Sequence, residues 1–223
     1  KFVAEGLPLN TFLMPKYAGV DKTNGLPMWY KDILGDNGEV IGTTMTSEYS
    51  EATEYLCDDP TPKLYGGFGT SFNFYNFDIS AAFTYSIGGL TYDSGYASYM
   101  SPPGGTVGSN FHRDVLKAWT PENKDSDVPR FVYQDQNINA SSDRFLVPAS
   151  YLNFQNAQIG YTIPSKITSR IKLDRVRVYV ACDNIWYWSY RHGLDPRSSF
   201  SGGTNYASNS PVRTITGGIN ITF

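Results

Sequence analysis

The feature that most constrains this chain is the alternation of apolar and polar residues over long segments. From Phe77 to Ile87 every odd position is apolar, and every even position except Ala82 is polar. Successive side chains of a β-strand point to opposite faces, so this period of two predicts a strand with one apolar and one polar face. The alternation predicts five such strands in all. They are expected at about 64–75, 77–88, 151–162, 175–187 and 212–223.

The strand around 151–162 changes phase within its length. Leu152 and Phe154 are apolar at even positions, whereas Ala157, Ile159 and Tyr161 are apolar at odd positions. One extra residue in a strand produces such a change, so we expect a β-bulge near Asn156.

Two architectures accommodate strands with one apolar face. In a soluble β-sandwich the apolar face packs a core, and in an outer-membrane barrel it contacts lipid. The expected strands are about twice as long as the ~5–6 residues typical of soluble proteins, and a membrane-crossing strand needs ~9–11. Aromatic residues also gather at one strand end, in Trp186, Tyr187, Trp188 and Tyr190, as in the aromatic belts of membrane proteins. The pattern therefore favours the barrel and leaves the sandwich open.

The connections between these strands alternate in length. A tight turn at Asn76 is followed by a long connection at about 89–149, a shorter one before Arg175, and a long one at about 188–211. Outer-membrane barrels alternate short periplasmic turns with long extracellular loops in this way. We therefore expect an all-β chain that supplies the C-terminal strands of a large transmembrane antiparallel β-barrel. Residues 63–223 form the barrel segment in this prediction, and residues 1–62 form an extracellular loop region.

Composition excludes other classes. The chain has 18 Lys and Arg against 21 Asp and Glu, a net charge of −3, and its basic residues form no run. Nucleic-acid binding is therefore not expected. The chain has no apolar run long enough for a transmembrane helix. Because it begins with Lys1, we expect a mature product or a piece of a longer protein.

Several segments resemble one protein family in the same order along the chain. The ending 217–223 resembles the terminal strand of outer-membrane barrels, which implies that Phe223 is part of the signal read by the barrel-assembly machinery. The whole series resembles the C-terminal part of SusC/RagA-type TonB-dependent transporters of the Bacteroidetes. The segments that carry the resemblance are Tyr17, Gly19-Val20-Asp21, Gly25, Gly66-Gly67-Phe68-Gly69-Thr70-Ser71-Phe72, Thr84-Tyr85-Ser86-Ile87-Gly88-Gly89, Trp119-Thr120-Pro121-Glu122-Asn123, Pro129-Arg130, Gly160-Tyr161, Arg177-Val178-Tyr179-Val180, Asp183-Asn184, Trp188 and Asp195-Pro196.

The resemblance implies a role in active import across the outer membrane. Such an importer moves glycans or oligopeptides, is capped by a SusD-like surface lipoprotein, and is energised by TonB acting on a plug. The plug and the N-terminal barrel strands are not in this sequence, so they are expected partners. Two alternatives stay open: a soluble carbohydrate-binding β-sandwich, and a small secreted or outer-membrane hydrolase.

The sequence offers no catalytic, metal or cofactor motif. His112 and His192 have no metal-ligand partners at the usual spacing, and no Gly-x-Ser-x-Gly sequence occurs. The segment Asp36-Asn37-Gly38 has a weak likeness to a calcium loop, but a glycine turn in a polar loop explains it better. We expect a protein that is not an enzyme, with no cofactor and no bound metal.

Loop aromatic and arginine side chains are the candidate substrate contacts, because they stack on sugar rings or hold peptide groups. For Trp119 and Arg130, the favoured alternative is that they help the loop to fold. For Tyr190 and Arg191, the alternative is that they belong to the aromatic belt. Asp195 and Arg213 either pair inside the barrel or touch substrate. The candidates are Trp119, Arg130, Tyr133, Tyr190 and Arg191.

The alternation also predicts the direction of single side chains. Phe72, Phe83, Ile219 and Ile221 are expected to face lipid. Ser71, Thr84 and Asn220 are expected to face the barrel lumen.

Overall fold

The computed structural model describes residues 1–100, 108, 110–133, 135, 137–198 and 211–223. The chain divides into two compact units, which are described separately. The sheet unit consists of residues 62–89, 149–197 and 209–223, and the loop unit of residues 1–61, 90–148 and 198–208. In the described part of the chain, no helix is both long and apolar enough to cross a membrane.

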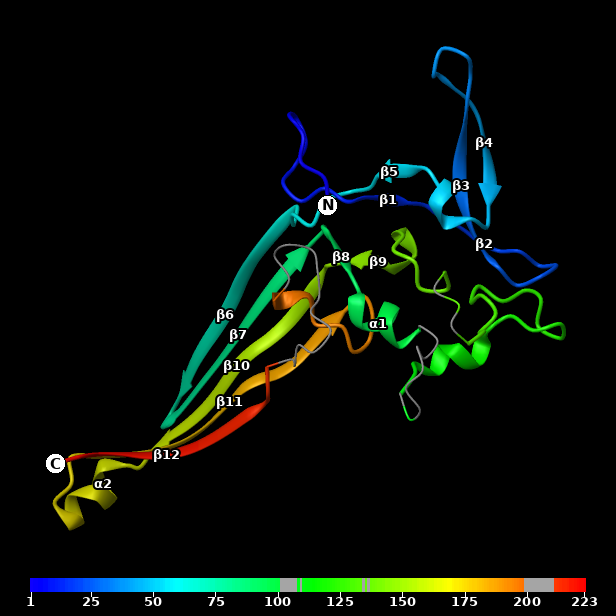
Figure 1. The fold of residues 1–223 in the computed structure, drawn as a ribbon. Coiled ribbons are helices and arrows are strands. Elements are labelled where there is room, and N and C mark those ends of the chain that lie inside the picture. Colours follow the sequence, from blue (N-terminus) through cyan, green and yellow to red (C-terminus); the bar gives the residue numbers. More distant parts are fainter. Residues whose placement is uncertain (101–107, 109, 134, 136, 199–210) are drawn as a thin grey trace. The chain divides into compact units, whose positions relative to one another are not determined.

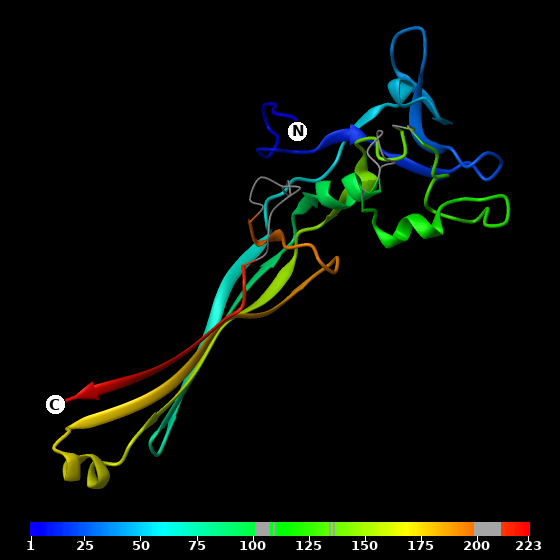
Figure 2. The ribbon, with the colours of Figure 1, turned by 60° about the horizontal axis from the view of Figure 1, so that its bottom comes forward.

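The sheet unit is built on one five-stranded antiparallel sheet (Figures 1 and 2). Its strand order is β6-β7-β10-β11-β12, so neighbouring strands follow one another in the sequence, with β8 and β9 of the other unit between β7 and β10. A short helix α2 and the 3₁₀ turn η4 connect β10 to β11, and the turn η5 follows β11. The bounds are β6 Leu64–Phe74, β7 Phe77–Ile87, β10 Tyr151–Thr162, α2 Ser165–Thr168, η4 Ser169–Ile171, β11 Arg175–Ser189, η5 Pro196–Ser198 and β12 Thr214–Thr222.

The strand bounds differ slightly from those expected from the alternation. β6 ends at Phe74 because Tyr75 has a φ of 52° and begins a two-residue turn to β7. β11 continues to Ser189, and β12 begins at Thr214. The bulge expected near Asn156 is confirmed, because β10 has one more residue than β7 between the pairs Phe154–Phe83 and Asn156–Ala82.

The register places the apolar side chains of all five strands on one face. One row across the sheet contains Phe68, Phe83, Phe154 and Trp186. Within it, the ring centroids of Phe68 and Phe83 are 4.9 Å apart, and those of Phe83 and Phe154 are 4.4 Å apart. The same face carries Leu64, Phe72, Phe74, Phe77, Ile79, Ile87, Ile159, Tyr161, Val178, Val180, Trp188, Ile215, Ile219 and Ile221.

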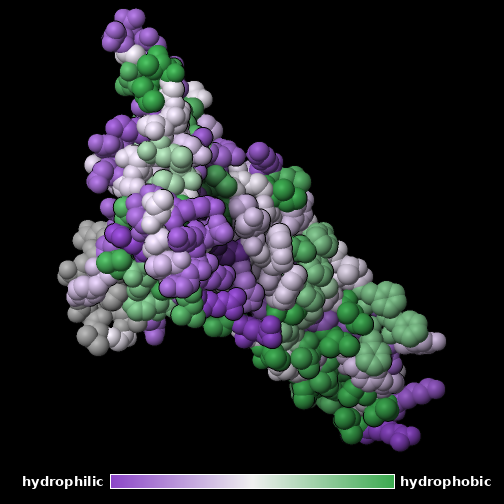
Figure 3. Space-filling view, turned by 90° about the vertical axis from the view of Figure 1, so that its right-hand side faces the viewer, coloured by the Kyte–Doolittle hydropathy of each residue, from purple (hydrophilic) through white to green (hydrophobic). Residues whose placement is uncertain are grey.

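This apolar face is exposed along its length. The exposed fraction is 44% for Ile79, 52% for Trp186 and 64% for Ile219. Figure 3 shows hydrophobic side chains gathered over the lower part of the sheet. A contiguous apolar surface that crosses five strands is far larger than the scattered apolar residues of a soluble surface.

The opposite face of the sheet is polar, and side-chain hydrogen bonds on it link different strands. Ser71, Thr84 and Asn220 lie together on this face, and their direction toward a barrel lumen stays a prediction. Near the tight turn, Arg177 of β11 donates to Asp78 of β7, with its Nε 2.9 Å from Oδ1, and so reaches across β10. Gly160 of β10 makes this possible, because a Cβ there would lie 2.6 Å from the Asp78 carboxylate oxygens.

The loop unit contains short strands, one-turn helices and its own small cores. A hairpin is formed by β2 and β3, β4 extends it, and β1 pairs with β5 and β8 with β9. Fully buried side chains include Phe12, Trp29, Met100, Ile138 and Phe145. The bounds are β1 Leu13–Pro15, β2 Tyr17–Val20, β3 Pro27–Leu34, β4 Val40–Thr46, η1 Tyr49–Glu51, β5 Glu54–Leu56, β8 Leu90–Tyr92, α1 Ser94–Tyr99, η2 Arg113–Lys117, η3 Asp143–Phe145 and β9 Leu146–Pro148.

Candidate ligand-binding groove of the sheet unit

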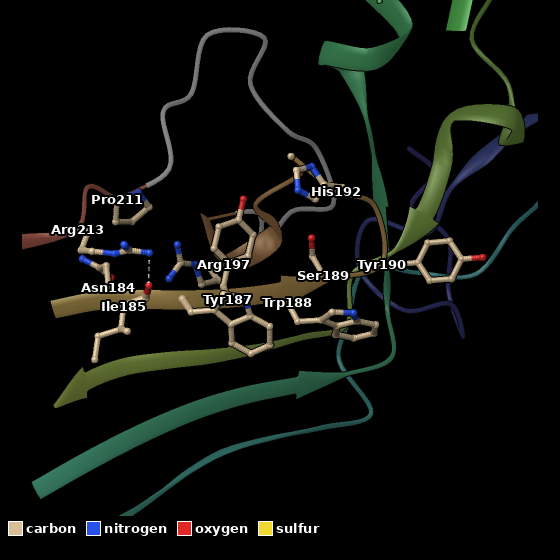
Figure 4. A pocket seen from close by; sticks show the side chains of 12 residues that line it. Asn184, Ile185, Tyr187, Trp188, Ser189, Tyr190, His192, Arg197, Pro211 and Arg213 are labelled. Atoms are coloured by element: carbon tan, nitrogen blue, oxygen red, sulfur yellow. Dashed lines mark hydrogen bonds between the residues drawn. The ribbon is translucent and has the colours of Figure 1, made fainter. Parts of the chain in front are cut away.

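The candidate site is a groove at the end of β11 with a volume of about 710 Å³. Ligand sites usually enclose about 300–1,000 Å³. Its lining comes from three consecutive parts of the sheet unit: the last residues of β11, the turn that follows, and the segment before β12 (Figure 4). The side chains with functional groups in this lining include Tyr187, Ser189, Tyr190, His192, Arg197 and Arg213.

A second irregularity in β11 shapes one end of the groove. Phe154 pairs with Trp186, whereas Asn156 pairs with Asp183, so β11 has one more residue than β10 across this step. Asn184 takes up the extra residue with a φ of 51°, a left-handed conformation that asparagine tolerates better than most residues. Its Nδ2 donates to the carbonyl of Val212 at 3.2 Å, and Arg213 Nη2 donates to the carbonyl of Ile185 at 2.6 Å. The bulge therefore anchors the start of β12.

The chain after β11 bends back in a tight turn. Ser189 Oγ lies 2.9 Å from the carbonyl oxygen of Arg191 and 2.7 Å from that of Leu194. The amide of Leu194 donates to the carbonyl of Arg191 at 3.1 Å, and the Leu194 side chain is buried. The single hydroxyl proton of Ser189 is shared between the two carbonyls, and these contacts close the turn over residues 189–194.

Arg197 is the best-held side chain of the groove. Its Nε and Nη2 donate to the two carboxylate oxygens of Asp195 at 2.8 and 2.7 Å, and its Nη1 donates to Asn153 Oδ1 of β10 at 2.7 Å. The guanidinium lies 4.7 Å from the ring centroid of Tyr187. Asn153 is itself buried and donates to Thr84 Oγ1 at 3.2 Å. The turn is thereby fixed to the polar face of β7, β10 and β11.

The electrostatics of the groove follow from these pairings. The hydrogen bonds to Asp195 raise the pKa of Arg197 above its usual value, and the two charges cancel. Arg213 is exposed at the groove and has no acidic partner among the described residues. The lining contains no Asp or Glu in the described part of the chain. The groove therefore combines an aromatic surface with positive charge.

The close-up view shows how these side chains divide between the two sides of β11. Tyr187, Arg197 and His192 lie on one side of the strand, and Ile185 and Trp188 lie on the other (Figure 4). The first side is the polar face, because Tyr187 pairs across the sheet with Asn153. The polar side chains Tyr187, His192 and Arg197 of the lining thus lie on the polar face, and the exposed indoles belong to the apolar face.

The substrate candidates from the sequence fall in both units. Tyr190 lines the groove and is exposed, and Arg191 lies in the adjoining turn. Trp119 and Arg130 belong to the loop unit, where the Trp119 amide donates to Val128 at 2.8 Å and the Arg130 amide donates to Gly25 at 2.9 Å. Tyr133 is exposed in the same unit.

Trp119 and Arg130 pack against one turn of the loop unit. A Cβ at Gly25 would lie 2.6 Å from Cδ2 of Trp119 and 3.0 Å from Cβ of Arg130. Arg130 Nη1 also donates to the carbonyl of Asn24 at 3.4 Å. Trp119 Nε1 and Arg130 Nε are buried, and neither has a hydrogen-bond partner within the described residues. This packing favours loop folding for both residues, and substrate contact stays a prediction.

Sequence reasoning missed the central residues of the groove. It left open whether Asp195 and Arg213 pair or touch substrate, and the structure pairs Asp195 with Arg197. The two-residue spacing of Asp195 and Arg197 was the available signal, because it suits a turn closed by an ion pair. The remaining prediction, Phe223, follows β12 as an exposed side chain. No group of three or more His, Cys, Asp or Glu side chains is placed to hold a metal in the described part of the chain.

Comparisons with known proteins find similar chains among the TonB-dependent receptors. No protein-family model matches the chain. TonB-dependent receptor P3 of Formosa agariphila is 29% identical over 237 residues, which cover 100% of this chain and 23% of that receptor. TonB-dependent receptor P26 of the same organism is 26% identical over 175 residues, or 74% of this chain and 17% of that receptor.

Solved structures give the same result. The RagAB peptide transporter matches with a TM-score of 0.73 at 27% identity, covering 96% of this chain and 23% of that chain. The chain is similar in sequence to TonB-dependent receptors and in fold to the RagAB transporter. The RagAB peptide importer in its closed-closed state matches with a TM-score of 0.75, covering 97% of this chain and 24% of the importer chain. This chain thus spans less than a quarter of the RagA-type chains, and its all-β fold class is confirmed.

Proposed function

We propose that this chain is part of a TonB-dependent importer of the outer membrane, and that its five long strands are a section of the barrel wall. The exposed apolar face of β6, β7, β10, β11 and β12 carries this proposal, because a barrel strand contacts lipid on one face and the lumen on the other. A β-sandwich would bury that face in a core. The polar face, with the groove, then lines the lumen.

In this proposal the loop unit and the turn after β11 lie on the extracellular side, and the tight turn at Asn76 lies in the periplasm. The remaining barrel strands and a plug complete the importer, TonB energises it through the plug, and Phe223 contributes to the signal for barrel assembly. A SusD-like surface lipoprotein covers the extracellular side. Substrate is held by loop and lumen side chains rather than chemically altered.

The substrate class we propose is oligopeptides. The sequence left glycans and oligopeptides open, and two solved structures similar to this chain are described as a peptide transporter and a peptide importer. An aromatic groove of about 710 Å³ accommodates a few peptide residues.

Fractionation of cells that produce the complete receptor tests the location. The proposal predicts that the receptor is recovered in the outer membrane and is released only by detergent. Recovery in the soluble fraction without detergent would contradict the barrel and support a soluble β-sandwich. Uptake of a labelled oligopeptide mixture by the same cells, lost when the receptor is deleted, tests the substrate class.

A further inference from the structure

We propose that the groove at the end of β11 is a carboxylate-recognition subsite, and that Arg213 makes the importer prefer acidic oligopeptides. This inference rests on the proposed function, because it assumes that an oligopeptide reaches the polar face of the sheet. It goes beyond that function by naming the residue that sets substrate charge preference.

The first observation is the difference between the two arginines of the groove. Arg197 donates three hydrogen bonds, two to Asp195 and one to Asn153, and these fix the position of its guanidinium. Asp195 also neutralises its charge. Arg213 makes one hydrogen bond, to the carbonyl of Ile185, which orients its guanidinium but neutralises nothing. The rest of its N–H groups have no hydrogen-bond partner among the described residues. A carboxylate accepts two parallel N–H bonds from such a group.

The second observation is the absence of competing negative charge. Within the described lining, the polar groups are amide, hydroxyl, imidazole and guanidinium, and none is a carboxylate. Two acids flank the lining. Asp195 is paired with Arg197, and its side chain is only 10% exposed. Asp183, which precedes Asn184 and pairs in register with Thr214, is outside the lining and accepts a hydrogen bond from Asn156 Nδ2 at 2.7 Å. An incoming carboxylate therefore meets Arg213 without repulsion from an unpaired acid in the lining.

The third observation is the rigidity of the surroundings. Arg213 is attached to the bulge through Ile185, Asn184 is attached to Val212, and Tyr187 is held under the Arg197 guanidinium. These contacts keep the Arg213 guanidinium and the Tyr187 ring on one side of the strand (Figure 4). A site held in this way loses little conformational entropy when a ligand binds.

The test uses the complete receptor, purified in detergent, and two fluorescent hexapeptides of Ala and Gly amidated at their C-termini. One peptide carries two Glu residues, and the other carries Gln at the same positions. The wild-type receptor is expected to bind the Glu peptide about tenfold more tightly, the lower range for a hydrogen bond to a charged group. The preference is expected to shrink as salt screens the charge.

Variants then assign the preference to Arg213. Arg213→Gln is expected to bind both peptides equally, and Arg213→Lys to restore part of the preference. Lys166→Gln, which removes the same charge from an exposed position on α2, serves as the matched control and is expected to keep the preference. An unchanged thermal unfolding midpoint of Arg213→Gln shows that the variant is folded.

The outcomes separate this inference from the proposed function. Equal binding of the two peptides by the wild-type receptor, or a full preference in Arg213→Gln, overturns the carboxylate subsite and leaves peptide import standing. If the wild-type receptor binds neither peptide, the proposed substrate class fails, and the subsite inference fails with it.

Discussion

Substitution of Gly25 tests whether Trp119 and Arg130 act as packing residues of the loop unit. Gly25 has a φ of +75°, and a Cβ there would lie 2.6 Å from Cδ2 of Trp119 and 3.0 Å from Cβ of Arg130. Gly25→Ala therefore carries two costs. The left-handed backbone costs an alanine about 1–2 kcal/mol, and overpacking of a filled site costs about 1–3 kcal/mol. Together they lower the local stability of this turn by about 2–5 kcal/mol.

Hydrogen–deuterium exchange of two backbone amides reports this loss. The Trp119 amide is bonded to Val128 and the Arg130 amide to Gly25 itself. A loss of about 2 kcal/mol, the low end of the range, speeds exchange roughly 30-fold when it occurs through local opening. The assay is mass spectrometry of peptides that cover residues 118–130 in the complete receptor.

Gly38→Ala is the matched control. Gly38 has a φ of +80°, but nothing lies within 4 Å of a Cβ placed there. It is therefore expected to leave the exchange of the Trp119 and Arg130 amides unchanged. If Gly25→Ala also leaves these amides unchanged, the packing account is refuted. A role of Trp119 and Arg130 in holding substrate would then be the better explanation.

Three other predictions follow from the contacts described above. Phe83→Lys places a charge on the apolar face between Phe68 and Phe154, and it is expected to lower the folding stability of the receptor by about 2–4 kcal/mol and with it the thermal unfolding midpoint. Ser71→Lys on the polar face is expected to lower the midpoint much less. Equal effects of the two substitutions would contradict the assignment of faces. Asp195→Asn removes the charged partner of Arg197 and is expected to destabilise the turn after β11. Hydrogen–deuterium exchange of the Leu194 amide is then expected to be roughly tenfold faster. Unchanged exchange would mean that the ion pair does not stabilise the turn. Burial raises the pKa of Asp143, so the folded loop unit binds this proton more tightly than the unfolded chain, and stability falls as pH rises from about 4 through the raised pKa. Asp143→Asn is expected to flatten this slope in thermal unfolding between pH 4 and 7, and the same slope in the variant would remove Asp143 as its cause.

The sheet was the more predictable part of the fold, because a strand with one apolar and one polar face has a period of two in its sequence. Phe77–Ile87 alternates except at Ala82, and Thr214–Thr222 alternates except at Gly217-Gly218. The change of phase at Asn156 marked the bulge in β10. The second bulge, at Asn184, was not predicted. Asparagine is one of the few residues that take a positive φ readily, but its position in an otherwise regular strand gives no separate signal.

The loop unit was less predictable, because its strands are short and pair across long sequence distances. β1 pairs with β5 about forty residues later, and no local pattern specifies such a pairing. The hairpin of β3 and β4 could have been predicted from the sequence. Asn37-Gly38 lies between two apolar pairs, Ile33-Leu34 and Val40-Ile41, which is a common hairpin signal, and the likeness to a calcium loop obscured it.

The groove could be predicted only in part. Tyr190 was a candidate from its residue type, and Asp195 and Arg213 were marked as residues that pair or bind. Arg197 was missed because its importance comes from Asn153 and Tyr187, which lie on two different strands. Contacts of that kind depend on the register between strands, and the sequence alone does not specify it.

Site-directed labelling of single cysteines in the complete receptor, inserted in lipid bilayers, tests the central claim most directly. The account predicts that a lipid-soluble reagent labels cysteines at Phe72, Phe83, Ile219 and Ile221, whereas a water-soluble reagent that enters the lumen labels cysteines at Ser71, Thr84 and Asn220. The native Cys57 and Cys182 are first replaced by serine. Labelling of the first set by the water-soluble reagent, and of the second by the lipid-soluble one, would contradict the membrane-facing sheet.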